Sequence, residues 1–163
     1  MITAFKLAGF FAAHAIWCVS DGENLIPILA FTTDSGDRKM ERLIINDNLE
    51  DSVNFGNQKL ESNEMDAIDA VLLYDGLIPL NGKKIDAVII KIRAYFSPKS
   101  KATLVVPYTP KTSGRFRVHK PKLLEWEHCE DFDLDTALET FFEGVAEHEQ
   151  GAEIWNNHLD ESQ

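Results

Sequence analysis

One stretch of the chain, residues 69–96, constrains the fold more than any other. Two runs rich in apolar and β-branched residues, 69–80 and 83–94, are joined by Asn81-Gly82. An Asn-Gly pair between such runs is the strongest short-range signal for an antiparallel hairpin, because both residues tolerate the left-handed backbone of a tight turn. We therefore expect a long hairpin at the centre of a β-sheet.

The turn also predicts the register of this hairpin. Leu80 faces Lys83, and the pairs continue outward until Val71 faces Ile92. Side chains alternate between the two faces of a strand. The face expected to form the core carries Val71, Leu73, Leu77, Val88, Ile90, Ile92 and Phe96. The other face is apolar near the turn and basic farther away, and it carries Leu72, Tyr74, Ile89, Lys91, Arg93 and Tyr95.

The remaining segments predict an α+β domain. An almost wholly apolar run predicts a buried helix over 3–19, and a polar stretch over 46–63 predicts either a short helix near residues 49–53 or a mobile loop. Further strands are expected over 25–33, 39–45, 102–108 and 115–125, the last interrupted at Pro121. We predict a single domain, 1–163, with an antiparallel sheet of about six strands. The N-terminal helix and a long C-terminal helix cover one face of that sheet.

The C-terminal helix has the clearest pattern. Asp133 is a suitable N-cap. Apolar positions then recur at alternating steps of four and three residues, at Leu134, Leu138, Phe141, Val145, His148, Ala152, Trp155 and Leu159. Gly144 and Gly151 weaken a helix by about 1 kcal/mol each relative to alanine, and Gly151 could divide it. The stripe predicts packing on the sheet or, alternatively, a homodimer through this helix.

Composition favours a soluble protein of a reducing compartment. Hydrophobic residues make up 44% of the 163-residue chain and charged residues 26%, which are ordinary globular values. The two cysteines, Cys18 and Cys129, do not form a disulfide framework. The apolar run over 7–19 is too short to span a membrane and lacks the flanks of a signal peptide. We therefore expect a cytoplasmic location and no membrane partner.

The net charge of −11 hides a segregation of charge along the chain. Residues 1–82 carry a net −8, residues 83–122 a net +10, and residues 123–163 a net −13 with no Lys or Arg. On the C-terminal helix Glu139, Glu143 and Glu147 form a ridge of like charge. The simplest interpretation is that this ridge lies near the basic strands of the same fold. The functional interpretation is that it docks a partner of opposite charge.

The basic block suggests a second kind of binding. Arg115, Arg117 and His119 share one side of their strand. Were this also the side of Lys91 and Arg93, the sheet would present a basic surface beside Tyr95, the combination that binds single-stranded nucleic acid. The overall negative charge argues against a polyanionic partner, so nucleic acid is not expected.

Asp75 and Asp86 lie diagonally across the hairpin on the mostly apolar face. Paired carboxylates can hold a proton or a cation. Buried carboxylates without partners are rare, so we interpret both as solvated groups near the turn. A bulge at Gly76 would turn Asp75 outward. Otherwise these carboxylates and His119 are the polar groups of a ligand pocket or an enzyme site.

The familiar catalytic and metal motifs fail on spacing. Residues 76–84 are one residue too long for a phosphate loop, and His148-Glu149 has no second histidine for a zinc protease helix. His14 and Cys18 have a workable ligand spacing, but the adjacent His128-Cys129 would be an awkward second pair for a tetrahedral site. Core packing of Cys18 and hydrogen bonding of His14 are simpler explanations. We expect no cofactor and no metal.

These observations favour a non-enzymatic protein-binding module, of the adaptor, chaperone or immunity-protein kind. The alternatives are a small-ligand-binding protein or enzyme with a pocket between sheet and helices, and nucleic-acid binding through residues 83–122. The candidate binding residues are Tyr74, Asp75, Asp86, Lys91, Arg93, Tyr95, Arg115, Arg117 and His119.

Overall fold

A computed structural model describes residues 1–162, which form four α-helices, a short 3₁₀ turn and eight strands. The predicted α+β class is confirmed, although the sheet has more strands than the six expected. In chain order the elements are α1 (Ile2–Ser20), β1 (Ile28–Thr32), β2 (Arg38–Arg42), α2 (Leu49–Ser62), β3 (Asp69–Leu80), β4 (Lys83–Ala94), β5 (Lys101–Thr109), η1 (Lys111–Ser113), β6 (Arg117–His119), β7 (Lys122–Glu127), α3 (Leu134–Glu147), α4 (Glu149–Asn157) and β8 (Leu159–Asp160).

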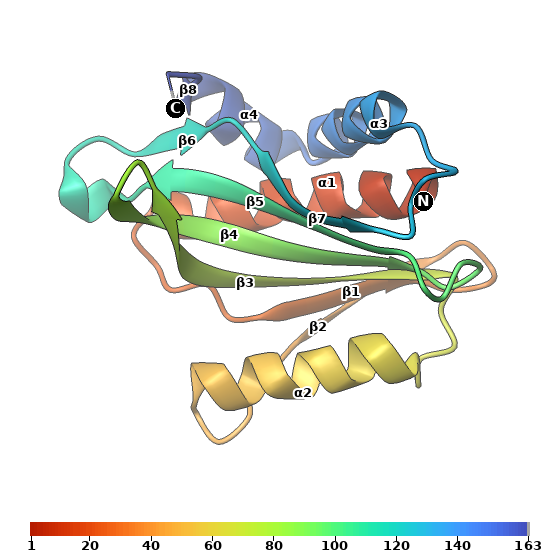
Figure 1. Ribbon diagram of the computed structural model, residues 1–163. Coiled ribbons are helices and arrows are strands. Elements are labelled where there is room, and N and C mark those ends of the chain that lie inside the picture. The colour runs from red at the N-terminus through yellow and green to blue at the C-terminus, as the bar shows by residue number, and fades with distance from the viewer. Residues whose placement is uncertain (163) are drawn as a thin grey trace.

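The elements stack in four layers, which Figure 1 shows from the side. Helices α3 and α4 form the outermost layer, α1 lies beneath them, the sheet comes next, and α2 lies on the opposite face of the sheet. The N- and C-terminal helices are therefore on one side of the sheet, as predicted. Only α1 packs on the strands, however, because α3 and α4 make their main contacts with α1. Most of the surface of α1 is buried in consequence.

The strand order is β2-β1-β3-β4-β5-β6-β8, and β7 also pairs with β5. The pairs are antiparallel except β6 with β8, which is parallel. Strands β6 and β7 lie end to end along the same edge of β5, because β6 pairs with its last residues and β7 with its first. The predicted break at Pro121 is confirmed, since it falls between these two strands.

The predicted hairpin register is confirmed pair by pair, from Leu80 with Lys83 to Val71 with Ile92. Asn81 and Gly82 both have positive φ, 53° and 78°, as the turn requires. The prediction that Leu77 and Phe96 belong to the core is wrong, since they are 60% and 69% exposed. Leu77 lies where the hairpin extends past the end of α1, and Phe96 lies in the turn after β4, so neither is covered by the helix.

The C-terminal helix begins at the predicted cap, where the Asp133 side chain accepts a hydrogen bond from the Asp135 N–H. It is interrupted at His148, and the expected break at Gly151 is wrong. Both helical glycines are contact points with α1. A Cβ at Gly144 would lie 2.0 Å from the Lys6 carbonyl oxygen, and one at Gly151 would lie 2.4 Å from the Ala13 carbonyl oxygen. These glycines allow the helix backbones to touch.

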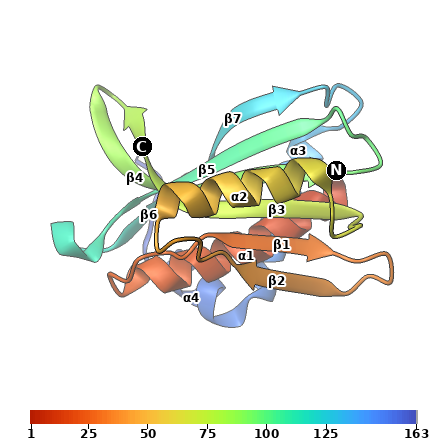
Figure 2. The same ribbon diagram turned by 90° about the horizontal axis from the view of Figure 1, so that it is seen from below.

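The polar stretch after β2 forms a full helix, α2, of 14 residues, longer than the short helix or loop expected. Asn48 caps it by accepting a hydrogen bond from the Asp51 N–H, and Asn63 ends it in the left-handed conformation. Its buried positions are two small residues, Ser52 and Gly56, and one leucine, Leu60. Figure 2 shows α2 running alongside β3.

By length and composition α1 would also suit a membrane span, as buried core helices and signal sequences do. In this structure 61% of the relevant window is buried, between the sheet on one side and α3 and α4 on the other. The helix supplies part of the largest apolar cluster, together with the predicted core residues of β3 and β4.

Candidate functional site

Asp75 is the predicted site residue with the most unusual surroundings. It lies on β3, on the face that carries Val71 and Leu73, just past the point where α1 ends at Ser20. The side chain is half-buried, and Oδ1 accepts a hydrogen bond from the Tyr108 hydroxyl at 2.8 Å. The interpretation of Asp75 as a solvated turn residue is therefore wrong. The register continues through Gly76 without a bulge, so Asp75 stays on the inner face.

The electrostatics of this position are unfavourable for a lone carboxylate. Burial raises the pKa of Asp75, and the neighbouring Asp86 carboxylate raises it further, while the hydrogen bond from Tyr108 opposes the shift. Burial and the same hydrogen bond raise the pKa of the Tyr108 hydroxyl. Each described ion pair of the molecule lies elsewhere, so no lysine or arginine compensates Asp75 within residues 1–162.

A small pocket of about 240 Å³ opens beside this carboxylate. Three carboxylates line it: Glu23, Asp75 and Asp86. The C-terminal end of α1 also lines it through Val19, and that end carries partial negative charge with no basic residue in the last helical turn. Asp75 and Asp86 thus line one hollow, the arrangement that the alternative interpretation of the sequence required, and the charges around this hollow are all negative.

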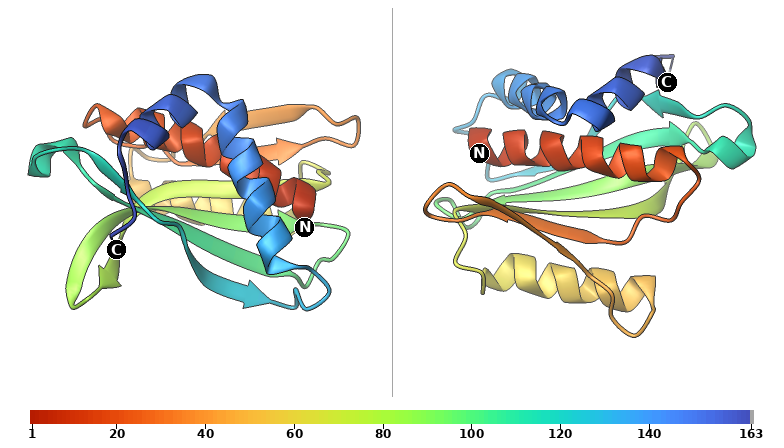
Figure 3. Two further views of the ribbon diagram at one scale, coloured as in Figure 1. Left: turned by 90° about the horizontal axis from the view of Figure 1, so that it is seen from above. Right: turned by 180° about the vertical axis from the view of Figure 1, so that it is seen from behind.

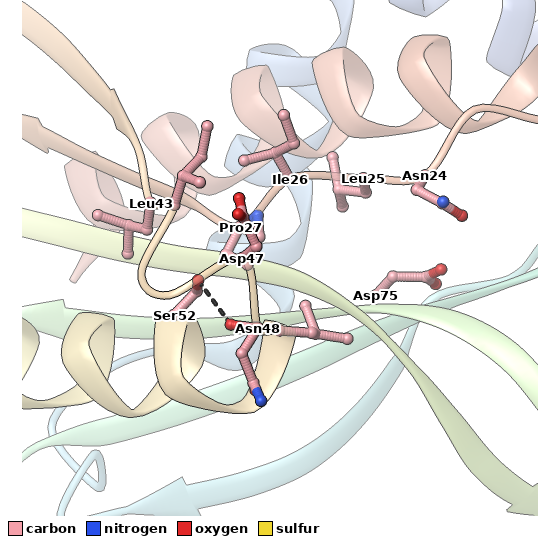
Figure 4. A pocket seen from close by; sticks show the side chains of 11 residues that line it. Asn24, Leu25, Ile26, Pro27, Leu43, Asp47, Asn48, Ser52 and Asp75 are labelled. Atoms are coloured by element: carbon pink, nitrogen blue, oxygen red, sulfur yellow. Dashed lines mark hydrogen bonds between the residues drawn. The ribbon is translucent and has the colours of Figure 1, made fainter.

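A larger pocket of about 550 Å³ adjoins the first and shares Asp75 and Asn24 with it. Figure 4 shows the segment after α1 on one wall, the start of α2 on another, and Asp75 on the strand. The lining is mixed, with apolar side chains in the majority: Asn24, Leu25, Ile26, Pro27, Leu43, Ile44, Asp47, Asn48, Leu49, Ser52 and Asp75. We call the two adjoining hollows the Asp75 pocket.

Four other candidate residues lie on the opposite face of the sheet, where α2 covers them. The Lys91 ammonium donates to Asn57 Oδ1 at 2.9 Å. The Arg93 guanidinium donates to Glu61 Oε1 through Nε and Nη2, at 3.0 and 2.7 Å. The Tyr95 hydroxyl donates to the Leu60 carbonyl at 2.6 Å, and Tyr74 packs against the same small apolar cluster. These side chains hold a helix in place and are not a free surface.

The last three candidates lie at the far edge of the sheet. Arg117 forms an ion pair with Asp160 of β8 at 3.6 Å, and Arg115 is exposed nearby. His119 is buried, with Nε2 2.9 Å from the Thr109 hydroxyl. The strand register puts Arg117 on the same side of the sheet as Lys91 and Arg93, as the conditional interpretation of the sequence required. No continuous basic surface results, because Lys91 and Arg93 bond to residues of α2 while Arg117 pairs with Asp160 at the far edge of the sheet.

The acidic ridge also differs from expectation. Glu147 pairs with Lys6 at 3.1 Å and with Arg38 at 2.8 Å, both outside the basic block 83–122. Glu139 and Glu143 are exposed and have no ion pair within the described residues. The basic strands pair instead with Glu61 of α2 and Asp160 of β8. The interpretation that the ridge neutralises the basic strands is wrong.

The histidines of the helical layer are structural, as the sequence suggested. His148 is buried; its Nδ1 accepts from the Gly151 N–H at 2.9 Å, and its Nε2 lies 3.1 Å from His14 Nδ1. Among residues 1–162, no three His, Cys, Asp or Glu side chains are arranged to hold a metal ion.

Sequence reasoning missed the roles of Tyr108, Glu23 and Asn24 in the Asp75 pocket. Tyr108 lies in a strand with no pattern of its own, and Glu23 and Asn24 resemble ordinary turn residues. No local pattern identifies them, because the pocket is assembled from the end of α1, β3 and β5. Comparison of this chain with family models, with curated proteins and with solved structures gave no match.

Proposed function

We propose that this protein is a non-enzymatic binding protein, and that the Asp75 pocket holds a small amphipathic molecule with a cationic group. The observation that carries the proposal is the half-buried Asp75 carboxylate, which has no cationic partner in the described chain and lies between an acidic and a mainly apolar hollow. A ligand ammonium beside Asp75 and Asp86 would compensate their charge. An apolar body would fill the space lined by Ile26, Leu43 and Leu49.

The size and lining of the larger hollow support this class of ligand. Its volume, about 550 Å³, falls in the range of small-molecule sites, which combine mainly apolar walls with a few convergent polar groups. A catalytic role is not proposed. Asp75 and Tyr108 form a hydrogen-bonded pair, but the lining of the Asp75 pocket includes no Ser-His or Cys-His pair that would make a nucleophile.

A matched pair of probes tests the proposal: hexylamine and 1-hexanol, titrated separately and followed by two-dimensional NMR. We expect hexylamine to shift the amides of Asn24 and Asp75 and to bind about tenfold more tightly than the alcohol, a difference of about 1.4 kcal/mol. Asp75→Asn should remove that preference, whereas Asp34→Asn in an exposed turn should not. Equal affinity for the two probes would contradict the proposal.

The second candidate function is protein binding through the acidic outer layer, which we define as the exposed acids of segment 130–161. Of the eleven Asp and Glu residues in this segment, only Glu147 and Asp160 form ion pairs among the described residues. Unpaired charge of one sign attracts and orients a partner of the opposite sign. The free cysteines, Cys18 and Cys129, support a cytoplasmic setting for either function.

Pull-down with wild-type protein and with a Glu139→Gln/Glu143→Gln variant tests this second candidate. A partner held by the acidic outer layer should be recovered by the wild type and lost by the variant. A Glu50→Gln/Glu64→Gln protein, altered at exposed acids of the opposite side, serves as the control and should keep the partner. Recovery of the same proteins by all three would exclude the acidic outer layer as the binding surface.

A further inference from the structure

A hollow of about 350 Å³ lies on the outer helical layer, between α3, α4 and the connection from β6 to β7. Its lining is mainly apolar. We call it the α3–α4 groove, lined by Lys120, Pro121, Leu138, Phe142, Trp155, Asn156, Leu159 and Glu161. We propose that this groove is the docking site for a basic protein segment that inserts an apolar side chain, a proposal that rests on the second candidate function above.

The groove exposes apolar surface that the fold does not use. Phe142 of α3 and Leu159 of β8 are each 44% exposed. Leu138 of α3 is partly buried, next to Phe141 and Val145, which are buried in the main cluster, and Leu159 lies beyond the end of α4, in β8. Exposed aromatic and aliphatic side chains gathered around one hollow are typical of interaction sites.

The floor of the groove is closely packed. Trp155 is 1% exposed and is held by Phe141, with ring centroids 6.2 Å apart. Phe142 meets Trp155 edge to face, with centroids 6.1 Å apart and planes at 80°. A pocket that exists before binding costs little to order, and buried aromatic groups are where binding energy concentrates. The groove therefore suits an inserted apolar side chain, which we call the anchor.

The acidic side chains around the groove favour a positively charged partner. Glu139 and Glu143 are exposed one turn apart beside Phe142, and Glu161 lines the groove. Against these acids stands Lys120, which also lines it. Figure 3 shows α3 and α4 lying over α1. The acids of these two helices are exposed, and among the described residues only Glu147 of this group forms ion pairs with other elements. A second copy of this chain would bring the same negative charge to the contact, which disfavours the homodimer and favours a basic partner.

Two synthetic peptides provide the test. Both carry the same lysines at helical spacing; one has a central Trp-Leu anchor, and the other has serines in its place. Binding is measured by fluorescence anisotropy of labelled peptides at low and at moderate salt. We expect the anchored peptide to bind at least about tenfold more tightly than the serine peptide at either salt concentration, because the anchor fills the groove while the lysines meet the acids.

Variants assign the effect to the groove. Phe142→Ser should weaken the anchored peptide about tenfold and leave the serine peptide unchanged. Leu77→Ser, at an exposed apolar position on the hairpin, is the matched control and should change neither. Glu139→Gln/Glu143→Gln should weaken both peptides and flatten the salt dependence.

The outcomes separate the two levels of the proposal. Equal binding of the two peptides, or full affinity of the Phe142→Ser protein for the anchored peptide, would overturn the groove as the docking site while leaving charge-driven protein binding intact. Failure of both peptides to bind the wild type at low salt would overturn the acidic outer layer and the groove together. Loss of binding by the Leu77→Ser control would overturn the assignment to this surface.

Discussion

The two faces of the sheet are covered in different ways. On one face α1 packs into the largest apolar cluster and is itself covered by α3 and α4, with helix backbones in contact at glycines. On the other face α2 covers a small apolar cluster that includes Leu60 and Leu72, and polar contacts at Lys91, Arg93 and Tyr95 hold it in place. One face is held by buried area, the other by a few directed bonds.

This difference in packing predicts which side of the sheet is more stable and which opens more easily. Apolar burial contributes about 25 cal/mol per Å² and grows with the covered area, so the α1 side should open only on global unfolding. Helix α2 buries three of its 14 residues and ends on exposed loops, so it should open locally at a lower cost. The large hollow of the Asp75 pocket is lined by the start of α2, which would make ligand access sensitive to that opening.

Adding a side-chain atom where α1 and α3 touch should cause the largest loss of stability. Gly144→Ala would ordinarily favour a helix by about 1 kcal/mol. Here the new Cβ would lie 2.0 Å from the Lys6 carbonyl oxygen and 2.9 Å from the Phe10 nitrogen, both backbone atoms that cannot move aside alone. We expect a loss of about 3 kcal/mol or more in urea unfolding.

The control for this prediction is Ala146→Gly, at an exposed position on the same helix, which should cost only about 1 kcal/mol. A Gly144→Ala protein as stable as the wild type would show that α1 and α3 do not touch as described, and the contrast between the two faces would fail.

Removing the hydrogen bonds of one side chain, Arg93, should destabilise α2 and leave α1 unaffected. Arg93→Met deletes two hydrogen bonds to Glu61 and one to the Ile92 carbonyl, while Glu61 remains hydrated. We expect a loss of about 1.5–3 kcal/mol, the range for hydrogen bonds to charged groups. Hydrogen exchange should accelerate at the amides of α2 and stay slow in α1.

Lys6→Met is the comparison on the other face, because Lys6 and its partner Glu147 are both more than a third exposed. It should cost less than about 1 kcal/mol. Equal acceleration of exchange in α1 and α2 of the Arg93→Met protein would mean that the two faces unfold as one unit.

Acid should weaken the α1 side through the His14–His148 contact. Because His148 Nδ1 accepts from the Gly151 N–H, its proton lies on Nε2 and is donated to His14 Nδ1. Burial lowers the pKa of both rings in the folded protein. As the pH falls, the unfolded chain therefore binds protons before the folded protein does. The contribution of the two neutral rings to the free energy of unfolding is complete above about pH 6.5. It declines below that pH by at most about 1.4 kcal/mol per pH unit for each ring.

His148→Asn isolates this effect, since asparagine can still cap α4 but cannot take up a proton. Unfolding by urea at several pH values between about 7.5 and 5 should give a shallower pH dependence for the variant. Parallel curves for the two proteins would show that this contact does not titrate with folding.

Features encoded by neighbouring residues could be predicted from the sequence. The Asn81-Gly82 turn and the alternation that follows it lead to the observed register, and Asp133 marks the start of α3. The position of α2 could not be predicted, because Leu60 is the only large apolar residue among its buried positions, Ser52, Gly56 and Leu60, and one such residue makes no periodic pattern. The same holds for the candidate site. Asp75 and Asp86 both belong to the hairpin, so the sequence could place them near each other, whereas Tyr108 and Glu23 come from segments distant in sequence.

The amino-acid order alone was sufficient for the hairpin, the helices at both ends and the division of charge into three blocks, because turns, caps and periodicity act over a few residues. Only the tertiary structure decided which charges meet. Glu61 on α2 reaches Arg93, Glu147 reaches Lys6, and the remaining acids of the last helices stay outside. Ion pairs depend on distances between segments far apart in the chain, and those distances follow from how the layers pack.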